Sequence, residues 1–504
     1  MKKLFLIAFL FPALMGSAQK KNDPTTFAKS ITPDDMKKHL YIVASKEMEG
    51  RETATPGQKR AAAYIENQFK SLGLAPGNNG SYQLPYGVYQ DSLTGASIEV
   101  NGKTFELDKD FSLTVGQSNT STYRFGEVVF VGNGIVDSVR DDYKGLDVRG
   151  KAVLMLAGQQ QGQGRGGFGN QFAKLDAAQK NGAVAVLVIG GNFPRSTKTN
   201  PKGNMYVNAF QKTVRPNQYQ VSEKIAQAIM GDDYVKAKAG ELPAKTYTTD
   251  LAVSFSKTTT HLESSDVLGV LEGTDLKDEY VFVTGHYDHL GKRDTVIYYG
   301  ADDDGSGTVG VLEIAEAFVK AKQAGKGPRR TMVFMTVSGE EKGLWGSAYY
   351  TNHPVFPLDK TTVDLNIDMI GRVDTSRHHG DSSNYVYVVG DDKVSTDLKV
   401  ISEGINKKYT KMELDYKFND PNDRQRIYFR SDHYNFAQKG VPIIFYYDGM
   451  LGGDYHKPTD TPDKINYNLM AKRAQLVFYT AWEMANRDAM LKRDLKLEVP
   501  QRGF

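Results

Sequence analysis

The chain has 504 residues, of which 40% are hydrophobic and 24% charged, so it contains enough apolar material for large folded cores. Lysine and arginine total 63 and aspartate and glutamate total 60, and this near balance excludes the strongly basic surface of a nucleic-acid-binding protein. The absence of cysteine excludes a thiol nucleophile, a disulfide framework and a cysteine-ligated metal. A metal site would have to use histidine, aspartate and glutamate.

The first residues have the pattern of an export signal. Lys2 and Lys3 form a basic start, residues 4–15 are mostly apolar, and residues 16–18 (Gly-Ser-Ala) have the small side chains of a cleavage site. The apolar stretch is shorter than a membrane-spanning helix requires, and no other segment approaches that length. We therefore expect residues 1–18 to be a signal peptide and the mature protein to be secreted or periplasmic, with no membrane partner.

The segment that follows, residues 19–105, is expected to form the N-terminal part of a larger domain. Helices are predicted over residues 34–45 and 56–72, and Thr55-Pro-Gly-Gln has the pattern of a capping box at the start of the second helix. Glycine, proline and asparagine are frequent in residues 75–92, which predicts a loop.

Residues 106–255 are predicted to form a separate, β-rich domain. Apolar runs predict buried strands at 151–157 and 183–189, with a helix over 172–180 between them. The glycine-rich loop before that helix contains a Gly-x-Gly-x-x-Gly match at residues 162–167. No acidic residue ends the second strand, so the match is not interpreted as a dinucleotide site.

Strands and helices alternate over residues 256–490, and residues 491–504 form a C-terminal tail. This alternation predicts an α/β domain with a mixed, mostly parallel twisted sheet flanked by helices. The expected strands are 280–284, 331–337, 363–367 and 441–447, and the expected helices begin near residues 307, 346 and 468.

Each expected strand is followed within a few residues by histidine or carboxylate side chains. The carboxyl ends of parallel strands meet at one edge of a sheet, where ligands bind, so these side chains are expected to converge. In strand order they are His286 and Asp288, Glu340 and Glu341, Asp368, and Asp454 and His456.

Three adjacent carboxylates, Asp302, Asp303 and Asp304, lie in a glycine-rich turn. They would repel one another unless a cation lay near them. The turn also fits the ligand spacing of an EF-hand, but an EF-hand needs an entering helix, and residues 294–300 are expected to be extended. Calcium binding is therefore the less favoured interpretation.

Together these motifs resemble the co-catalytic zinc exopeptidases, the family that includes secreted bacterial aminopeptidases and glutamate carboxypeptidase. They occur in the family's order and cover most of residues 262–465. The middle of the chain, around Asp147-Val-Arg-Gly-Lys, resembles a protease-associated domain inserted into the peptidase. The shared motifs are Gly-His286-Tyr-Asp288-His-Leu-Gly, Gly-Ala-Asp302-Asp303-Asp-Gly-Ser-Gly, Glu340-Glu341, Asn-Ile-Asp368-Met and Tyr-His456-Lys-Pro-Thr-Asp-Thr.

The resemblance implies a site with two Zn²⁺ ions per chain. His286 and Asp368 would hold one zinc, Glu341 and His456 would hold the other, and Asp302 would bridge the two. Histidine nitrogen and carboxylate oxygen are ordinary zinc ligands, so the chemistry of these side chains agrees with the assignment.

The resemblance also implies roles for residues that do not bind metal. Glu340 would be the general base, which takes a proton from water and passes it to the leaving amine. Asp288 would accept the second N–H of the His286 imidazole and fix its tautomer. The peptide bond between Asp302 and Asp303 is expected to be cis, as in the family.

Other polar residues near the motifs receive weaker predictions. His289 is expected only to support its loop. Residues 431–433 (Ser-Asp-His) resemble a family motif near the active site, but no role is assigned to them. Arg424, Arg426 and Arg430 could contact a peptide carboxylate, although solvated loop charge is the favoured interpretation.

We therefore expect an exported zinc aminopeptidase that hydrolyses peptide bonds at a free N-terminus, with peptides as its substrates. A carboxypeptidase or dipeptidase on the same metals is one alternative. A mono-zinc glutaminyl cyclase is another, against which the long inserted domain argues. A non-catalytic peptide-binding protein is the third, against which the complete ligand set argues. The pattern contains no information on side-chain preference or oligomeric state.

Overall fold

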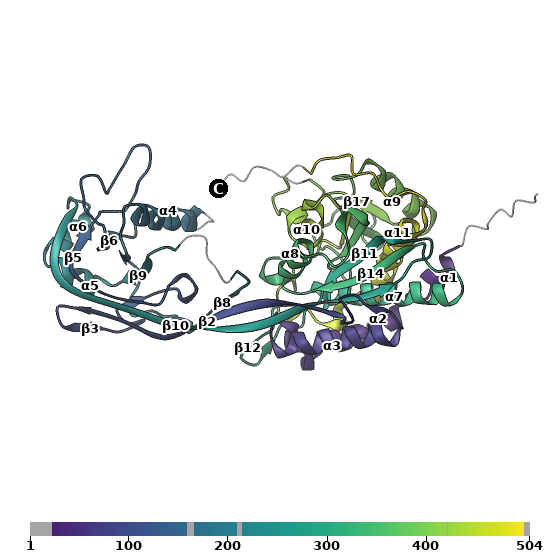
Figure 1. Ribbon diagram of the computed structural model, residues 1–504, viewed down its shortest axis with the longest axis horizontal. Helices are drawn as coiled ribbons and strands as arrows, with labels where there is room; N and C mark the ends of the chain where they lie inside the picture. The colour runs from purple at the N-terminus through teal and green to yellow at the C-terminus, as the bar shows by residue number, and fades with distance from the viewer. Residues whose placement is uncertain (1–22, 159–165, 209–213, 421, 498–504) are drawn as a thin grey trace, which may run out of the picture. The chain divides into compact units, whose positions relative to one another are not determined.

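The chain folds into two compact units, each with its own hydrophobic core (Figure 1). It passes from unit 1 into unit 2 after Leu84 and returns to unit 1 after Ser265. The expected signal peptide lies outside the residues that can be described. The computed structural model describes four stretches of the chain: residues 23–158, 166–208, 214–420 and 422–497.

Unit 1 is built on a mixed, mainly parallel sheet, as the alternation of strands and helices predicts. Four neighbouring strands, β18, β15, β11 and β14, run parallel, and the two flanking pairings, β16 with β18 and β14 with β10, are antiparallel. The strands in their order across the sheet are β17 (Glu413–Asp415), β16 (Tyr385–Val389), β18 (Ile443–Tyr447), β15 (Thr361–Ile367), β11 (Leu276–His286), β14 (Arg330–Val337) and the C-terminal part of β10 (Lys245–Leu271).

The register of the parallel strands brings their carboxyl ends to one edge of the sheet. His286, the last residue of β11, is level with Val337, the last residue of β14. Ile367, the last residue of β15, is level with Tyr446 of β18. The strands are buried along almost their whole length, which is why their sequences are continuous apolar runs.

Helices cover this sheet and complete the core of unit 1. Helix α7 is apolar on nearly every side, so it is buried, and it contacts β11, β14, α2 and α11. The helices are α1 (Thr25–Ala28), α2 (Pro33–Val43), α3 (Pro56–Ser71), α7 (Gly307–Gln323), α8 (Trp345–Asn352), α9 (Thr396–Lys408), α10 (His433–Gln438) and α11 (Tyr467–Asn486).

The start of α3 differs from the expected capping box. Pro56 occupies the first helical position as predicted, but the Thr55 side chain does not cap the helix. Its hydroxyl instead donates a hydrogen bond to the carbonyl of Glu52, 2.6 Å away, which closes the turn before the helix. Local backbone bonding of this kind competes with capping for a threonine hydroxyl.

Unit 2 contains the first part of β10 and the segments between Pro85 and Ser265. Strand β9 pairs parallel with β7, β7 with β6, and β6 with β5, and β5 is antiparallel to β10. Its elements are β2 (Gln83–Val100), β3 (Lys103–Phe105), β4 (Phe111–Ser112), β5 (Ser121–Phe130), β6 (Ala152–Leu156), α4 (Gly166–Lys180), β7 (Ala185–Ile189), β8 (Lys202–Tyr206), β9 (Asn217–Val221), α5 (Glu223–Met230) and α6 (Asp233–Ala239).

The boundaries of unit 2 differ from the predicted domain, residues 106–255, because two long strands extend beyond it. The predicted loop over residues 75–92 is wrong where β2 begins. Leu84, Tyr86 and Val88 are buried in alternation, and this burial favours a strand over the local glycine and proline content. In the described parts of the chain, no helix combines the length and apolarity needed to cross a membrane.

Candidate active site

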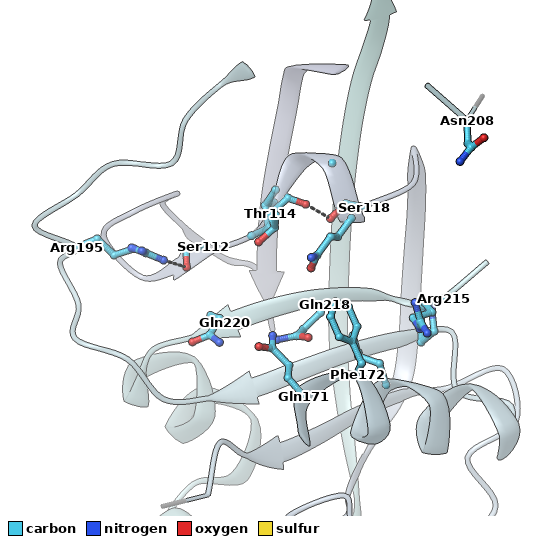
Figure 2. Close-up of a pocket in the computed structure, with 15 residues that line it drawn as sticks. Ser112, Thr114, Ser118, Gln171, Phe172, Arg195, Asn208, Arg215, Gln218 and Gln220 are labelled. Carbon is cyan, nitrogen blue, oxygen red and sulfur yellow. Dashed lines mark hydrogen bonds between the residues drawn. The ribbon is translucent and has the colours of Figure 1, made fainter. Parts of the chain in front are cut away.

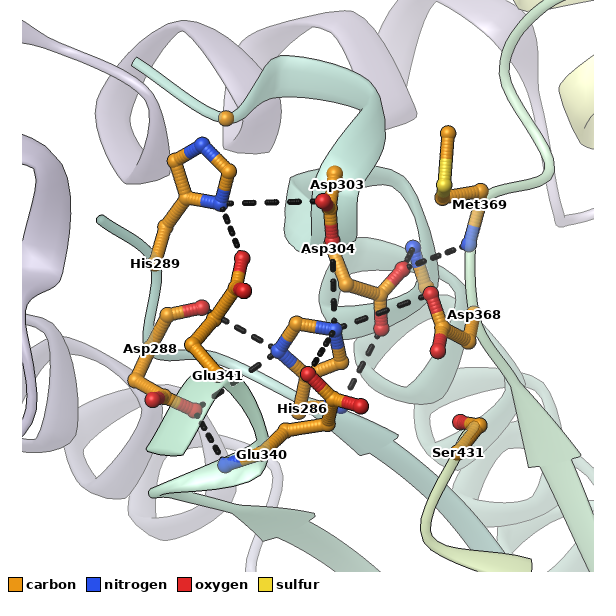
Figure 3. Close-up of polar contacts among 12 residues, drawn as sticks. His286, Asp288, His289, Asp303, Asp304, Glu340, Glu341, Asp368, Met369 and Ser431 are labelled. Carbon is orange, nitrogen blue, oxygen red and sulfur yellow. Dashed lines mark hydrogen bonds and ion pairs between the residues drawn. The ribbon is translucent and has the colours of Figure 1, made fainter. Parts of the chain in front are cut away.

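Histidine and carboxylate side chains gather at the carboxyl edge of the unit 1 sheet (Figure 3). They come from the end of β11, the turn before α7, the turn after β14 and the residue after β15. The predicted convergence of strand ends therefore occurs for these residues, whereas Asp454, after β18, forms ion pairs with Arg372 and Lys464 instead. Two groups can be distinguished, and one carboxylate belongs to both.

The first group consists of His286, Asp303 and Asp368, all buried. His286 Nε2 lies 3.3 Å from Asp303 Oδ1 and 3.6 Å from Asp368 Oδ1. One ligand atom from each residue lies within 4.8 Å of the others, which is close enough for a single metal ion to contact all three.

The second group surrounds the other oxygen of Asp303. His456 Nε2 lies 3.1 Å from Asp303 Oδ2 and 3.2 Å from Glu341 Oε2. His289 Nδ1 lies 2.8 Å from Glu341 Oε1 and 3.9 Å from Asp303 Oδ2. These side chains offer a second position for a divalent cation, with two histidines and two carboxylates around it.

Asp303, and not Asp302, is the carboxylate shared by the two groups, so the predicted bridging residue is off by one. Asp302 points elsewhere: its Oδ1 accepts a hydrogen bond from the backbone N–H of Gly371 at 2.8 Å. The turn is fixed by Asp460, whose carboxylate accepts the backbone N–H groups of both Asp302 and Asp303. The direction of each carboxylate follows from this anchoring.

The third aspartate of the turn, Asp304, is a structural residue. Its carboxylate accepts backbone N–H groups from His286 (3.1 Å), Gly307 (2.8 Å) and Met369 (2.9 Å). It thereby joins the end of β11, the start of α7 and the loop after β15. The cis peptide bond lies between Asp303 and Asp304, one position later than expected.

The donor atoms of the site fit divalent cations. His286 Nε2 and Asp303 Oδ2 are buried atoms that form no hydrogen bond. Within the described ranges, only histidines form ion pairs with Asp303, Glu341 and Asp368, so no lysine or arginine neutralises them. Buried nitrogen and oxygen atoms that lack hydrogen-bond partners and surround one point are suitable ligands for zinc.

Electrostatic effects on the side chains indicate the same need for positive charge. Burial lowers the pKa of His456, but its contacts with Asp303 and Glu341 outweigh burial and raise the pKa to about 10. Burial raises the pKa of Glu340 well above its usual range, and the charges of Glu341 and Asp368 raise it further. The site therefore holds more negative charge than its side chains can stabilise without a cation.

The orientation of His286 is fixed from the side opposite Asp303. Its Nδ1 lies 3.1 Å from the backbone carbonyl of Asp288 and 3.6 Å from the carboxylate of that residue. The Nδ1–H therefore donates to the carbonyl, which leaves Nε2 directed at Asp303. The Asp288 carboxylate has other partners: it accepts the backbone N–H of Glu340 and the hydroxyl of Thr53.

Glu340 lies beside the first group at the wall of a small pocket. Its Oε2 is 3.9 Å from His286 Nε2. The remaining wall of the pocket is mostly apolar and aromatic. The lining residues are Asp303, Glu340, Asp368, Met369, Ile427, Arg430, Phe445, Tyr447, Leu451 and Tyr455.

Two residues of the site were missed or undervalued by the sequence reasoning. His289 is fully buried and faces Glu341, although it was expected only to support its loop. Arg51 is also fully buried, and its guanidinium donates to the carbonyls of Tyr287, Tyr299 and Gly300. The signals in the sequence were the three-residue spacing of His286 and His289 and the run Glu49-Gly50-Arg51.

The Ser-Asp-His motif packs behind the site. Ser431 accepts a hydrogen bond from the Asn366 amide at 2.8 Å. His433 contacts the carbonyl of Tyr428 and stacks on Phe445, and burial lowers its pKa to about 3, so it is neutral. Arg430 is exposed and lines the pocket, where its guanidinium donates a hydrogen bond to the Tyr455 hydroxyl at 2.8 Å.

Unit 2 contains a larger cavity of about 1000 Å³ with a different lining (Figure 2). Amide side chains from α4 and β9, including Gln171, Gln218 and Gln220, face it, together with the aromatic ring of Phe172. Arg195, which donates to the Ser112 hydroxyl, also lines the cavity. The described lining has no histidine or carboxylate, so it offers no metal ligands.

Residues 266–481 match the model of Peptidase family M28. The match lies within unit 1 and includes every histidine and carboxylate of the two groups. Unit 2 lies outside the match, so its interpretation as a protease-associated domain stays a prediction.

Curated relatives match less than half of the chain. A probable leucine aminopeptidase of Trichophyton verrucosum is 31% identical over 214 residues, which make up 41% of this chain and 55% of that protein. A probable leucine aminopeptidase of Arthroderma otae is 32% identical over 216 residues, 42% of this chain and 55% of that protein. The chain thus spans about half the length of the curated relatives it matches.

Solved structures share the fold. An aminopeptidase from Aneurinibacillus sp. strain AM-1 is similar with a TM-score of 0.54 and 19% identity, covering 95% of this chain and 100% of that one. A zinc aminopeptidase from Bacillus subtilis has a TM-score of 0.51 and 18% identity, covering 92% of this chain and 99% of that one. These likenesses support the mixed α/β fold class.

Proposed function

We propose that this chain, whose residues 266–481 belong to peptidase family M28, is a zinc aminopeptidase with two Zn²⁺ ions at the two groups that share Asp303. The main support for two ions is the position of Asp303, because one carboxylate oxygen faces His286 and the other faces His456. A shared carboxylate between two sets of histidine and carboxylate ligands suits a pair of cations rather than one.

Bound zinc would supply Lewis-acid chemistry, polarising a peptide carbonyl and lowering the pKa of a nearby water. Glu340 then acts as the general base: its carboxylate takes the proton from the water and passes it to the nitrogen of the leaving amine. The place of Glu340 in the pocket wall, with its Oε2 3.9 Å from His286 Nε2, supports this role, since its carboxylate lies beside the first group. Asp288 positions His286 through its carbonyl and Glu340 through its carboxylate.

The pocket beside Glu340 supports a preference for apolar N-terminal residues. Met369, Ile427 and Phe445 in its wall are nearly fully buried, so an apolar side chain would find apolar contacts there. Curated relatives named probable leucine aminopeptidase agree with this class of substrate.

The N-terminal sequence pattern supports export, and we propose that the enzyme works outside the cytoplasm. Peptides are its proposed partners. We propose that unit 2 serves substrate access or partner binding, because its cavity contains hydrogen-bonding amides but no catalytic groups.

The test combines metal analysis with hydrolysis of a panel of aminoacyl anilides. We expect two zinc ions per chain and faster cleavage of leucyl and phenylalanyl anilides than of glutamyl or glycyl anilides. Glu340→Gln should lower kcat by about 100- to 10,000-fold with the zinc content unchanged, because the metal ligands remain.

N-acetylated peptides provide the matched control for the substrate. A free-amine enzyme should not cleave them. Efficient cleavage of acetylated peptides with a free C-terminus would favour a carboxypeptidase, and a single zinc with no hydrolysis would favour a cyclase or a binding protein. Either outcome would overturn the aminopeptidase proposal.

A further inference from the structure

A short segment near the start of unit 1, residues 50–53, runs along the base of the site, and we call it the strap. Its backbone is tied to the loop that follows β11. The carbonyl of Gly50 accepts the N–H of Gly291 at 2.9 Å, and the carbonyl of Arg51 accepts the N–H of His289 at 3.3 Å. The strap therefore adds a short pairing beside the loop that contains His289.

The strap is held in an unfavourable backbone conformation. Arg51 has φ 52°, and Glu49 and Ala54, which flank the strap, have φ 49° and 61°. These values lie in the left-handed region that non-glycine residues seldom adopt. At Gly50, an added Cβ would lie 2.3 Å from the carbonyl oxygen of Gly291, so no larger residue fits. Strain of this kind persists only where surrounding contacts enforce it, and it clusters at functional sites.

Two strap side chains are connected to the turn that contains Glu340, Thr53 through Asp288 and Glu52 directly. The Thr53 hydroxyl donates to Asp288 Oδ2 at 2.6 Å, and both residues are fully buried. The other oxygen, Asp288 Oδ1, accepts the backbone N–H of Glu340 at 3.2 Å. Glu52 Oε1 lies 2.7 Å from Lys342 Nζ at the far end of the same turn.

The turn needs such anchors because glycines flank it. Gly339 has φ 76° and Gly343 has φ 110°, so the short turn between them, Glu340–Lys342, is attached at both ends to the most flexible residue type. The strap holds one end of the turn through Asp288 and the other through Lys342.

We propose that the strap is a positioning element for the general base, and that Thr53 is its central positioning residue. Its hydroxyl holds the Asp288 carboxylate so that the second oxygen of that carboxylate fixes the backbone of Glu340. This inference rests on the proposed function, since it assigns Thr53 a role through Glu340. It does not require Thr53 to touch substrate or metal.

The test compares Thr53→Val with Thr53→Ser in the full-length, zinc-saturated protein. Valine keeps the shape and removes the hydroxyl, and serine keeps the hydroxyl. We expect Thr53→Val to lower kcat by about 10- to 100-fold, as loss of an outer partner of a metal site commonly does, with little change in KM. Thr53→Ser should restore most of the activity.

Thr480→Val is the matched control, because Thr480 is a buried threonine of the same unit whose hydroxyl donates to a backbone carbonyl, that of Leu476, away from the site. It should leave kcat unchanged. A double variant supplies the second control: in the Glu340→Gln background, Thr53→Val should cause little further loss, because the group it positions is already inactive.

Hydrogen–deuterium exchange gives a readout independent of activity. Peptides that cover residues 338–344 should exchange about tenfold faster in Thr53→Val than in the unaltered protein or in Thr480→Val, because one hydrogen-bonded anchor of the turn is lost. Unchanged exchange together with unchanged kcat would overturn the proposal, as would an equal loss of kcat in the Glu340→Gln background. If the unaltered, zinc-loaded protein cleaves no free-amine substrate, the proposed function fails, and exchange alone decides the role of the strap.

Discussion

Two clusters in unit 1 contain the same residue types but differ in how their charge is balanced. At the candidate active site, Asp303 is surrounded by histidines. In the other cluster, Glu413 and Asp415 lie beside His379, and the buried guanidinium of Arg377 contacts both carboxylates. Both sets place histidine and carboxylate atoms within reach of a metal ion.

The difference shows why spacing alone does not define a metal site. Burial raises the pKa of Asp415, but hydrogen bonds from the Lys417 backbone, His379 and Arg377 outweigh it and lower the pKa below its usual range. Arg377 supplies the positive charge that a metal would bring. At the active site this charge is missing, and the buried Nε2 of His286 has no hydrogen-bond partner.

The largest expected effect comes from replacing one carboxylate in each cluster and comparing the two variants. Asp303→Asn should abolish zinc binding at both positions and lower kcat by about 1000-fold or more, because several kcal/mol of transition-state stabilisation depend on the metals. Asp415→Asn should leave zinc per chain and kcat unchanged. Metal analysis and anilide hydrolysis on both variants check this, and a normal zinc content in Asp303→Asn would contradict it.

The second prediction concerns the removal of the positive charge of Arg377 from the other cluster. Arg377→Met removes the guanidinium that contacts both Glu413 and Asp415, and we expect a loss of about 3 kcal/mol in the free energy of unfolding. Arg377→Lys should recover only part of this, because an ammonium group cannot contact two carboxylates as a guanidinium does. Urea unfolding measures both. A stability equal to that of the unaltered protein would show that the cluster needs no internal cation.

The smallest expected effect concerns a third histidine–carboxylate pair, His39 and Glu313, 3.6 Å apart. Burial raises the pKa of Glu313 from 4.5 to about 8. The folded state therefore holds this proton more tightly than the unfolded state. The stability it contributes is fully present below about pH 4.5 and is lost as the pH rises through about 8.

Glu313→Gln removes this titration. The variant should match the unaltered protein in unfolding free energy at pH 5 and exceed it by about 2 kcal/mol or more at pH 8. Urea unfolding at the two pH values tests the prediction. Equal stability at pH 8 would mean that Glu313 is ionised without penalty, and that His39 neutralises it as Arg377 neutralises Asp415.

Much of the site could be predicted from the sequence because its signals are local. Apolar runs mark the buried strands, and the residues directly after them, such as His286, Glu340 and Asp368, must meet at the edge of a parallel sheet. The fold class and the gathering of these side chains follow from that rule. This rule applies without knowledge of how any individual side chain is oriented.

The errors arose where contacts distant in sequence decide the outcome. Asp302 and Asp303 are chemically identical neighbours, and their directions are set by Asp460, which is 158 positions later in the chain. The Thr53–Asp288 contact spans 235 positions and leaves no periodic pattern. The strand β2 was missed because glycine and proline content was weighed above the alternation of Leu84, Tyr86 and Val88.

The strap also has a consequence for the order in which a newly made chain acquires its parts. Arg51 contacts the carbonyl of Gly300, 249 positions later, with the whole of unit 2 between them. Unit 1 therefore cannot finish folding until synthesis has passed far beyond unit 2, and such long-range contacts form late. A partly synthesised chain would hold the strap without the turn it anchors, so the proposed activity would appear only after His456 has been made.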